Sequence, residues 1–225
     1  MKTDKAMFQD QYRLRFTLSE KYRNAVWQTL CQAYLSKLIS SEASVIDIGS
    51  GWGEFINNIK AAPKYAMDMN PDAGERLSRD IHFIHQDCSQ EWPFQGDSLD
   101  VVFTSNFFEH LPDKNHIEST ISEAYRCLKL NGLIICLGPN IKYVPGKYWD
   151  FWDHLIPITE LSLSELLKLK GFSIHTCKPR FLPYSMSTKR HYPLFLLKMY
   201  LKMPFLWPLF GKQFFVVGIK KRECI

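Results

Sequence analysis

Apolar and polar positions along the chain alternate between short strand-like runs and longer amphipathic segments. Apolar runs rich in β-branched and aromatic residues predict strands, at 44–48, 64–69, 81–85, 99–104, 132–137, 172–177 and 213–220. Apolar residues at three- and four-residue steps predict helices, at 20–39, 54–61, 72–79, 113–129 and 159–170. Strands that alternate with helices in this way predict an α/β fold with a doubly wound, mostly parallel, seven-stranded sheet.

The alternation breaks down near the end of the chain. No helical pattern stands directly before the run at 213–220, so we expect this last strand to be antiparallel. An apolar insertion at 180–212 precedes it instead. We therefore expect an N-terminal helical segment at 1–43, whose helix is capped by Ser19, and a domain at 44–225 that carries the insertion.

Composition limits the class of protein. A chain of 225 residues with 46% hydrophobic and 23% charged residues is typical of one folded globular domain. The charged residues of 1–16 leave no apolar run, so we expect no secretory signal peptide. None of the six cysteines forms a C-x-x-C pair, and most lie in apolar runs. We expect free thiols in a reducing cytoplasm and no metal ligands.

The clearest chemical signal follows the first predicted strand, where 49–53 reads Gly-Ser-Gly-Trp-Gly. A strand that enters a glycine-rich turn presents backbone N–H groups to a nucleotide cofactor. A dinucleotide site requires glycine at the sixth position, which here is Glu54. Asp47 would repel a pyrophosphate but suits a ligand with a cationic amine and a sulfonium. These features make a nicotinamide-dependent oxidoreductase the disfavoured alternative.

The segment from Asp47 to Gly53 resembles the first motif of class I S-adenosylmethionine-dependent methyltransferases. The resemblance extends through 65–70, 85–88, 97–111 and 130–135, although Trp52 and Asn131 depart from the usual small residues. It implies a Rossmann-like methyltransferase fold, with an acid for the ribose hydroxyls and a group for the adenine amine after the second and third strands. The residues that it assigns to the cofactor are Asp47, Gly49, Gly51, Gly53, Asp68, Met69, Asp87, Cys88 and Ser105.

The segment at 139–154 follows the fifth strand, where this fold presents its substrate. Its aromatic and charged residues are too numerous for a simple connection, so we expect it to bind the methyl acceptor. His154 is the first candidate for a general base, with Asp150 or Asp153 as its orienting partner or as the base itself. His110, in the loop after the fourth strand, is the second candidate.

The expected reaction is methyl transfer to a small molecule, a sugar or a lipid-linked glycan, with oxygen as the acceptor atom. The protein must chiefly hold the acceptor in line with the methyl donor. A non-catalytic module that binds S-adenosylmethionine is the alternative from a different class. Nucleic acid is not expected as a substrate, because 105–108 reads Ser-Asn-Phe-Phe rather than an Asn-Pro-Pro-Tyr type of motif.

The net charge of +5 conceals a basic tail. Residues 178–225 hold ten Lys and Arg residues and one acidic residue, whereas the preceding part is slightly acidic. Lys198 and Lys202 share one helical face within the apolar segment 192–211, whose three prolines exclude a transmembrane helix. Such a helix suits peripheral contact with the inner face of the membrane. A lid, a dimer interface and packing onto the body remain alternatives.

Overall fold

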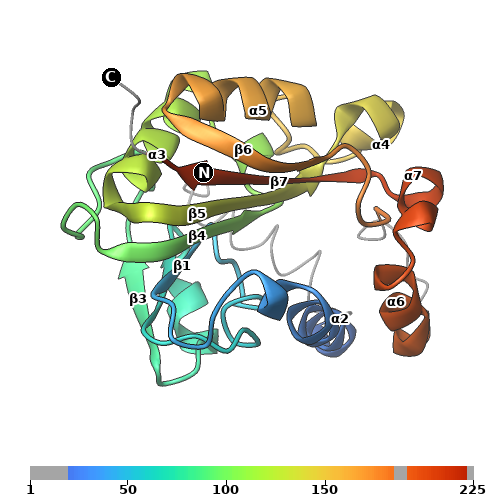
Figure 1. The fold of residues 1–225 in the computed structure, drawn as a ribbon, viewed down its shortest axis with the longest axis horizontal. Helices are drawn as coiled ribbons and strands as arrows, with labels where there is room; N and C mark the ends of the chain where they lie inside the picture. The colour runs from blue at the N-terminus through green and yellow to red at the C-terminus, as the bar shows by residue number, and fades with distance from the viewer. Residues whose placement is uncertain (1–19, 185–191, 222–225) are drawn as a thin grey trace, which may run out of the picture.

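The computed structural model describes residues 20–184 and 192–221. They form a seven-stranded sheet in the order β3-β2-β1-β4-β5-β7-β6 (Figure 1). β1 to β5 pair in parallel, and β7 runs antiparallel to both β5 and β6. The strands are β1 (Val45–Ile48), β2 (Lys64–Asp68), β3 (Ile81–His85), β4 (Leu99–Ser105), β5 (Leu128–Pro139), β6 (Phe172–Lys178) and β7 (Gln213–Lys220). The predicted sheet and its antiparallel last strand are confirmed.

Helices cover both faces of this sheet. They are α2 (Glu20–Ala33), α3 (Lys114–Cys127), α4 (Pro145–Tyr148), α5 (Glu160–Leu169), α6 (Leu194–Leu201) and α7 (Trp207–Phe210). Ile46 and Ile48 of β1 face the core that contains residues of α3 and α5, whereas Val45 faces the core that contains residues of α2 and α6. Every residue of β1 is buried, which explains its uniformly apolar run apart from Asp47.

Two predicted helices are wrong. The segment 54–61 forms turns, in which the Asn58 side chain donates a hydrogen bond to the Glu54 carbonyl at 2.8 Å. Asparagine side chains compete with helical hydrogen bonding in this way. The segment 72–79 contains only the 3₁₀ helix η3 (Pro71–Arg76), with Gly74, a poor helix former, inside it. The predicted cap Ser19 lies outside the described residues, and α2 is followed by the 3₁₀ helix η2 (Leu35–Lys37).

The fifth strand begins earlier than the predicted start at 132. β5 begins at Leu128, and its register with β4 shifts from Leu99↔Leu128 to Val101↔Leu133. Asn131 lies within this shift and has a φ of 65°, in the left-handed region. The irregularity around Asn131 is therefore a bulge that lets the strand start earlier.

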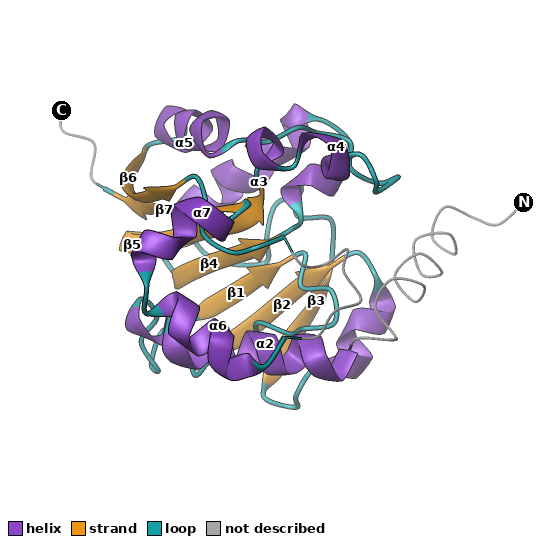
Figure 2. Ribbon diagram, turned by 90° about the vertical axis from the view of Figure 1, so that its right-hand side faces the viewer, coloured by secondary structure: helices purple, strands orange, loops and turns teal. Residues whose placement is uncertain are grey.

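The insertion packs one side onto the body and leaves the other exposed. α6 lies beside α2 (Figures 1 and 2), and the backbone of Tyr192 exchanges two hydrogen bonds of 3.0 Å with the Tyr22 hydroxyl. Leu201 and Trp207 are buried in the core on this side. Within the described part of the chain, no helix combines the length and apolarity that a membrane crossing requires.

Glu160 ties the ends of three elements together. Its buried carboxylate accepts hydrogen bonds from Asn140, which follows β5, at 2.5 Å and from Lys142 at 2.7 Å. Asn140 also donates to the carbonyl of Pro179, which follows β6, at 2.9 Å. Burial raises the pKa of Glu160, but the hydrogen bonds from Lys142 and Asn140 outweigh it, so this pKa lies below 4.5.

We expect Glu160→Ala to lower the free energy of unfolding by about 1–3 kcal/mol, because Asn140 and Lys142 lose a shared charged acceptor. A folded-state pKa below the unfolded one adds stability above the unfolded pKa. That stability is lost as the pH falls through the folded value. Urea unfolding between pH 7 and pH 3 measures both effects. Glu165→Ala, an exposed change on the same helix, is the control, and equal losses for the two variants would contradict the assignment.

Candidate functional site

The turn after β1 depends on three glycines in the left-handed region. Gly49, Gly51 and Gly53 have φ values of 66°, 56° and 74°, which side-chain-bearing residues rarely adopt. A Cβ on Gly49 would lie 2.2 Å from the ring of Phe107, in the loop after β4. These glycines therefore let the turn curve over the edge of the sheet and let the loop after β4 approach it.

Two carboxylates lie beneath this turn. Asp68, at the end of β2, accepts hydrogen bonds from the N–H groups of Gly51 and Asn70, each at 2.8 Å. Burial raises the pKa of Asp68 despite these hydrogen bonds. Asp47 is buried in β1, and its pKa is raised well above 3.8, first by burial and then by the negative charge of Asp68. Two such carboxylates favour a positively charged ligand.

Ser50 supplies a second sign that the turn accepts a ligand. Its hydroxyl is buried and has no hydrogen-bond partner among the residues that the structure describes. An unpaired buried hydroxyl is costly, so a ligand that supplies the missing partner is favoured. The turn thus fits a cation with polar groups, such as S-adenosylmethionine.

The N-terminal helix covers the turn, which no sequence motif indicated. Arg23 of α2 forms an ion pair with Glu54, the residue that excluded a dinucleotide motif. The guanidinium of Arg76 lies 3.9 Å from the ring centroid of Trp52 and pairs with Glu20 of α2 at 2.6 Å. Trp52 is the bulky residue that stands where the methyltransferase motif usually has a small one. Its ring is held by cation–π contact with Arg76.

The other residues assigned to the cofactor lie at or beside the same edge. Met69 follows β2 and is 62% exposed, and Ser105 ends β4 and accepts a hydrogen bond from Asn106 at 2.8 Å. Asp87 accepts the N–H of Ser89 at 2.8 Å in a turn after β3. Cys88 differs, because its side chain is buried in the core and contacts Thr120, and burial raises its pKa to about 12. Its side chain is therefore directed into the core.

Asp100 belongs to the resembling stretch but lies at the opposite end of the sheet. It accepts hydrogen bonds from Ser44 at 2.7 and 2.9 Å and from Lys129 at 2.9 Å. These contacts hold the start of β4 against neighbouring segments, so the role of Asp100 is structural.

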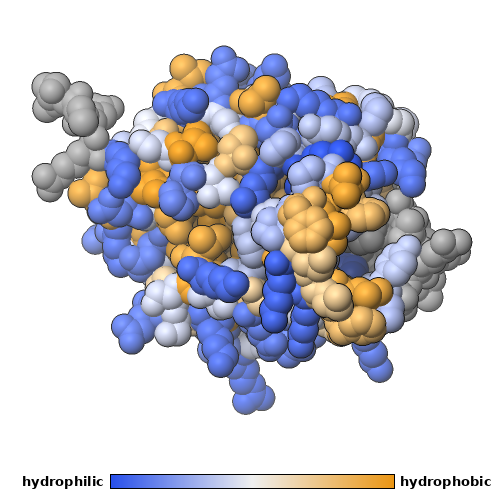
Figure 3. Space-filling model, turned by 45° about the vertical axis from the view of Figure 1, so that its right-hand side comes forward, coloured by the Kyte–Doolittle hydropathy of each residue, from blue (hydrophilic) through white to orange (hydrophobic). Residues whose placement is uncertain are grey.

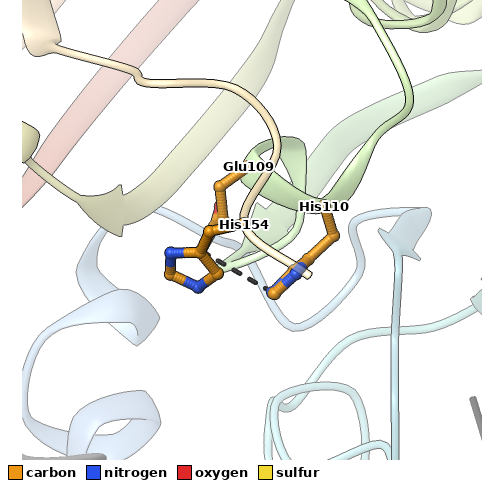
Figure 4. Close-up of side chains that lie close together, drawn as sticks. All are labelled: Glu109, His110 and His154. Atoms are coloured by element: carbon orange, nitrogen blue, oxygen red, sulfur yellow. Dashed lines mark ion pairs between the residues drawn. The ribbon is translucent and has the colours of Figure 1, made fainter. Parts of the chain in front are cut away.

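A second group of residues, the Glu-His-His cluster of Glu109, His110 and His154, forms where two loops meet (Figure 4). Glu109 and His110 belong to the 3₁₀ helix η4 (Phe108–His110), and His154 comes from the loop that contains α4. One potential ligand atom from each residue lies within 4.8 Å of the other two. The rings of His110 and His154 are 4.8 Å apart, edge to face.

Backbone hydrogen bonds dock the two loops. The N–H groups of Leu155 and Ile156 donate to the Glu109 carbonyl at 2.8 and 3.2 Å. The ring of His154 stacks on Phe151 at 4.9 Å and meets the edge of Tyr148 at 4.7 Å, and both His154 and Tyr148 are buried. The aromatic residues of 139–154 therefore pack partly beneath the cluster and hold His154 in place.

The structure pairs Asp153 with His110. Nδ1 of His110 lies 3.2 Å from the Asp153 carboxylate and 3.0 Å from its carbonyl oxygen. Burial lowers the pKa of His110, but Asp153 and Glu109 outweigh it and raise that pKa. Burial raises the pKa of Glu109 to about 6. Asp150, the other predicted partner, is exposed on the outer side of the loop.

The sheet order, the glycine turn and the acids beneath it define the class as that of S-adenosylmethionine-dependent methyltransferases, with S-adenosylmethionine as the cofactor. A family model described as a methyltransferase domain matches residues 19–176. The chain therefore belongs to the methyltransferase domain family.

Relatives and solved structures agree with this family. The chain is 28% identical over 149 residues to a ubiquinone/menaquinone biosynthesis C-methyltransferase of Bartonella bacilliformis, covering 59% of this chain. It spans only 56% of that relative's length. An Archaeoglobus fulgidus methyltransferase shares the fold with a TM-score of 0.68 and 20% identity, over 91% of this chain and 98% of that one. A chain of the Haloferax volcanii complex of the Trm112 activator with a methyltransferase aligns with a TM-score of 0.67 and 16% identity, over 92% and 95%.

We expect Gly49→Ala to destabilise the fold by at least about 1–2 kcal/mol, because alanine is strained at this φ and its methyl group displaces Phe107. Gly146→Ala is the matched control, since nothing lies within 4 Å of its added methyl group. Thermal unfolding of both variants checks this, and an unchanged melting temperature for Gly49→Ala would contradict the close packing.

Proposed function

We propose that the protein transfers a methyl group to a small-molecule acceptor with an ionisable hydroxyl, such as a phenol or an enol, and that oxygen is the atom methylated. The observation that carries this proposal is the Asp153–His110 pair beside the buried Glu109, which can take a hydroxyl proton. The relative from Bartonella bacilliformis is named a C-methyltransferase. A deprotonated phenol is nucleophilic at oxygen and at ring carbon, so ring carbon is the second candidate.

In this proposal the edge above β1 and β2 holds the cofactor. Asp68 binds the ribose hydroxyls, Asp47 faces the cationic part, and Asp87 and the Cys88 backbone meet the adenine. The glycine turn, Met69 and Ser105 line the remaining space. S-adenosylmethionine, when bound, supplies an electrophilic methyl group on a positively charged sulfur.

The Glu-His-His cluster handles the acceptor's proton. Because Nδ1 of His110 donates to Asp153, its Nε2 is the basic atom, and this nitrogen lies 4.0 Å from Glu109. A proton taken from the hydroxyl is stabilised on His110 by the two neighbouring carboxylates. His154, held by Phe151 and Tyr148, forms a wall for a planar ring and is the second candidate for the base.

We expect Asp68→Asn to weaken S-adenosylmethionine binding about 10–100-fold, because a charge-assisted hydrogen bond of about 1.5–3 kcal/mol is lost. Calorimetry on both proteins measures it. The raised pKa of Asp68 also predicts that wild-type affinity falls on acidification and that the variant responds less. Asp97→Asn, at an exposed turn, is the control; the same affinity for wild type and Asp68→Asn would refute the assigned role.

The acceptor class is tested with labelled S-adenosylmethionine and a panel of phenols, hydroquinones and matched amines. We expect transfer to hydroxyl-bearing rings, with mass spectrometry locating the methyl group on oxygen. His110→Ala should lower kcat about 10²–10⁴-fold through loss of the base, whereas His116→Ala, at the surface of α3, should not. Transfer to amines alone would refute the proposal.

The proposed acceptor is hydrophobic or lipid-linked, because an exposed apolar face lies on the same side of the molecule as the loop at 139–154. We call this loop the acceptor loop. Half of the large apolar side chains exposed within the described residues belong to 192–210: Tyr192, Phe195, Leu196, Met199, Phe205, Leu209 and Phe210. Figure 3 shows apolar side chains gathered here, and Figures 1 and 2 place α4, α6 and α7 on one side.

Lys198 and Lys202 are exposed in the same segment, so an anionic membrane surface is the occupant that we propose. Each lysine near such a surface adds about 1 kcal/mol of attraction. Peripheral contact of α6 and α7 with the membrane would then bring the loop at 139–154 close to a lipid-soluble acceptor. The corresponding location is the cytoplasm, at the inner face of the membrane.

Vesicle co-sedimentation tests this surface. We expect binding to phosphatidylglycerol-containing vesicles and little binding to pure phosphatidylcholine. The double variant Phe205→Ser and Leu209→Ser should lose binding, and Lys198→Glu with Lys202→Glu should weaken it several-fold. Leu161→Ser with Leu169→Ser, on the exposed side of α5, removes equally exposed leucines elsewhere as a control. Binding that survives the first double variant would exclude this face.

A further inference from the structure

We infer that the Glu-His-His cluster is a site for a divalent first-row metal ion of the zinc type. Its ligands are the Glu109 carboxylate, Nε2 of His110 and one ring nitrogen of His154. Two histidines and one glutamate form the ligand set of many catalytic zinc sites, which keep a coordination position open for substrate. Within residues 20–184 and 192–221, no other three metal-binding side chains converge in this way.

The spacing of the cluster is close to that of a metal site. Nε2 of His110 is 4.0 Å from Oε1 of Glu109, and the largest separation among the three ligand atoms is 4.8 Å. Zinc bonds of about 2.0–2.2 Å place ligand atoms about 3–3.6 Å apart. Small side-chain rotations therefore close the cluster around an ion without movement of the two docked loops.

The hydrogen bonds around His110 select the nitrogen that binds the metal. Nδ1 faces the carboxylate and the carbonyl oxygen of Asp153 at 3.2 and 3.0 Å, so Nδ1 carries the hydrogen and Nε2 keeps its lone pair. A histidine that donates to a carboxylate while its other nitrogen binds the ion is the usual second shell of a zinc site. This contact orients the ring and raises its basicity toward the metal.

The burial of Glu109 also supports a metal site. Glu109 is only 2% exposed. A buried carboxylate costs free energy unless positive charge compensates it. A surface pair gives an internal contrast, because His116 lies 2.8 Å from Asp113 without a third ligand and is accessible to water. That pair caps α3, whereas the Glu-His-His cluster joins two loops through side chains with no capping role.

The role of the ion rests on the proposed function. A hydroxyl of the acceptor that binds the open coordination position loses its proton to water more readily, because the metal stabilises the oxyanion. With the ion bound, Nε2 of His110 holds the metal and the proton passes to water, so His110 acts as the base only in the metal-free protein. The ion would then orient the oxygen as well as activate it.

Titration with Co²⁺ and Zn²⁺ tests the site without reference to activity. Protein stripped with EDTA should bind one equivalent of Zn²⁺, measured by elemental analysis, and Co²⁺ should give the visible absorption of a histidine-bound ion. His110→Ala, His154→Ala and Glu109→Gln should lose this binding. Asp153→Asn should weaken it about 10–100-fold through loss of the second shell. His116→Ala and Asp113→Asn should bind like wild type.

The outcomes separate the metal site from the proposed reaction. Wild-type binding no tighter than that of His110→Ala and Glu109→Gln, with all three proteins folded by circular dichroism, would overturn the site. If His154→Ala does not fold, metal binding by Glu109→Gln and Asp153→Asn still tests the site. Metal binding that depends on the cluster, together with no methyl transfer to any hydroxyl-bearing ring, would support the site and refute the proposed acceptor.

Discussion

Parallel pairing of β1 with β2 and β4 brings the ends of three strands to one edge of the sheet, and the site depends on this alignment. The register places Ile48 opposite both Met67 and Thr104, so the residues that follow each strand emerge together. The glycine turn, Asp68 and the loop after β4 therefore meet, although they are far apart in the sequence. Left-handed glycines let these segments approach without steric conflict.

Buried negative charge is the second property of this edge. Asp47 and Asp68 lie beneath the glycine turn, and Glu109 lies beneath the acceptor loop, each with a pKa raised by burial. Desolvated carboxylates of this kind are stabilised by positive charge. In the function and metal site that we propose, a cationic cofactor above the first two carboxylates and a proton or metal ion at the third compensate this charge.

The outer parts of the molecule organise this edge from both sides. α2 binds the glycine turn through Arg23 and Glu54, and the acceptor loop binds η4 through backbone hydrogen bonds to Glu109. The insertion between β6 and β7 packs Trp207 inward and keeps its apolar outer face exposed. The sheet thereby supports the cofactor edge together with the surfaces that we propose for the acceptor and the membrane.

Local sequence was sufficient to predict the sheet, because the period of the apolar residues and the positions of β-branched residues directly indicate which strands are buried. The strands and the antiparallel β7 followed from it, whereas the family resemblance assigned Asp47 and Asp68 to the edge after β1 and β2. It failed at 54–61, where the Asn58 side chain takes the Glu54 carbonyl that a helix would use. Only the tertiary structure joined His110 to Asp153 and brought Glu109 to His154, since loops docked by backbone hydrogen bonds carry no periodic signal. The sequence by itself thus determined the fold and, through the family resemblance, the edge proposed for the cofactor, whereas long-range packing decided which groups lie beside the loop at 139–154.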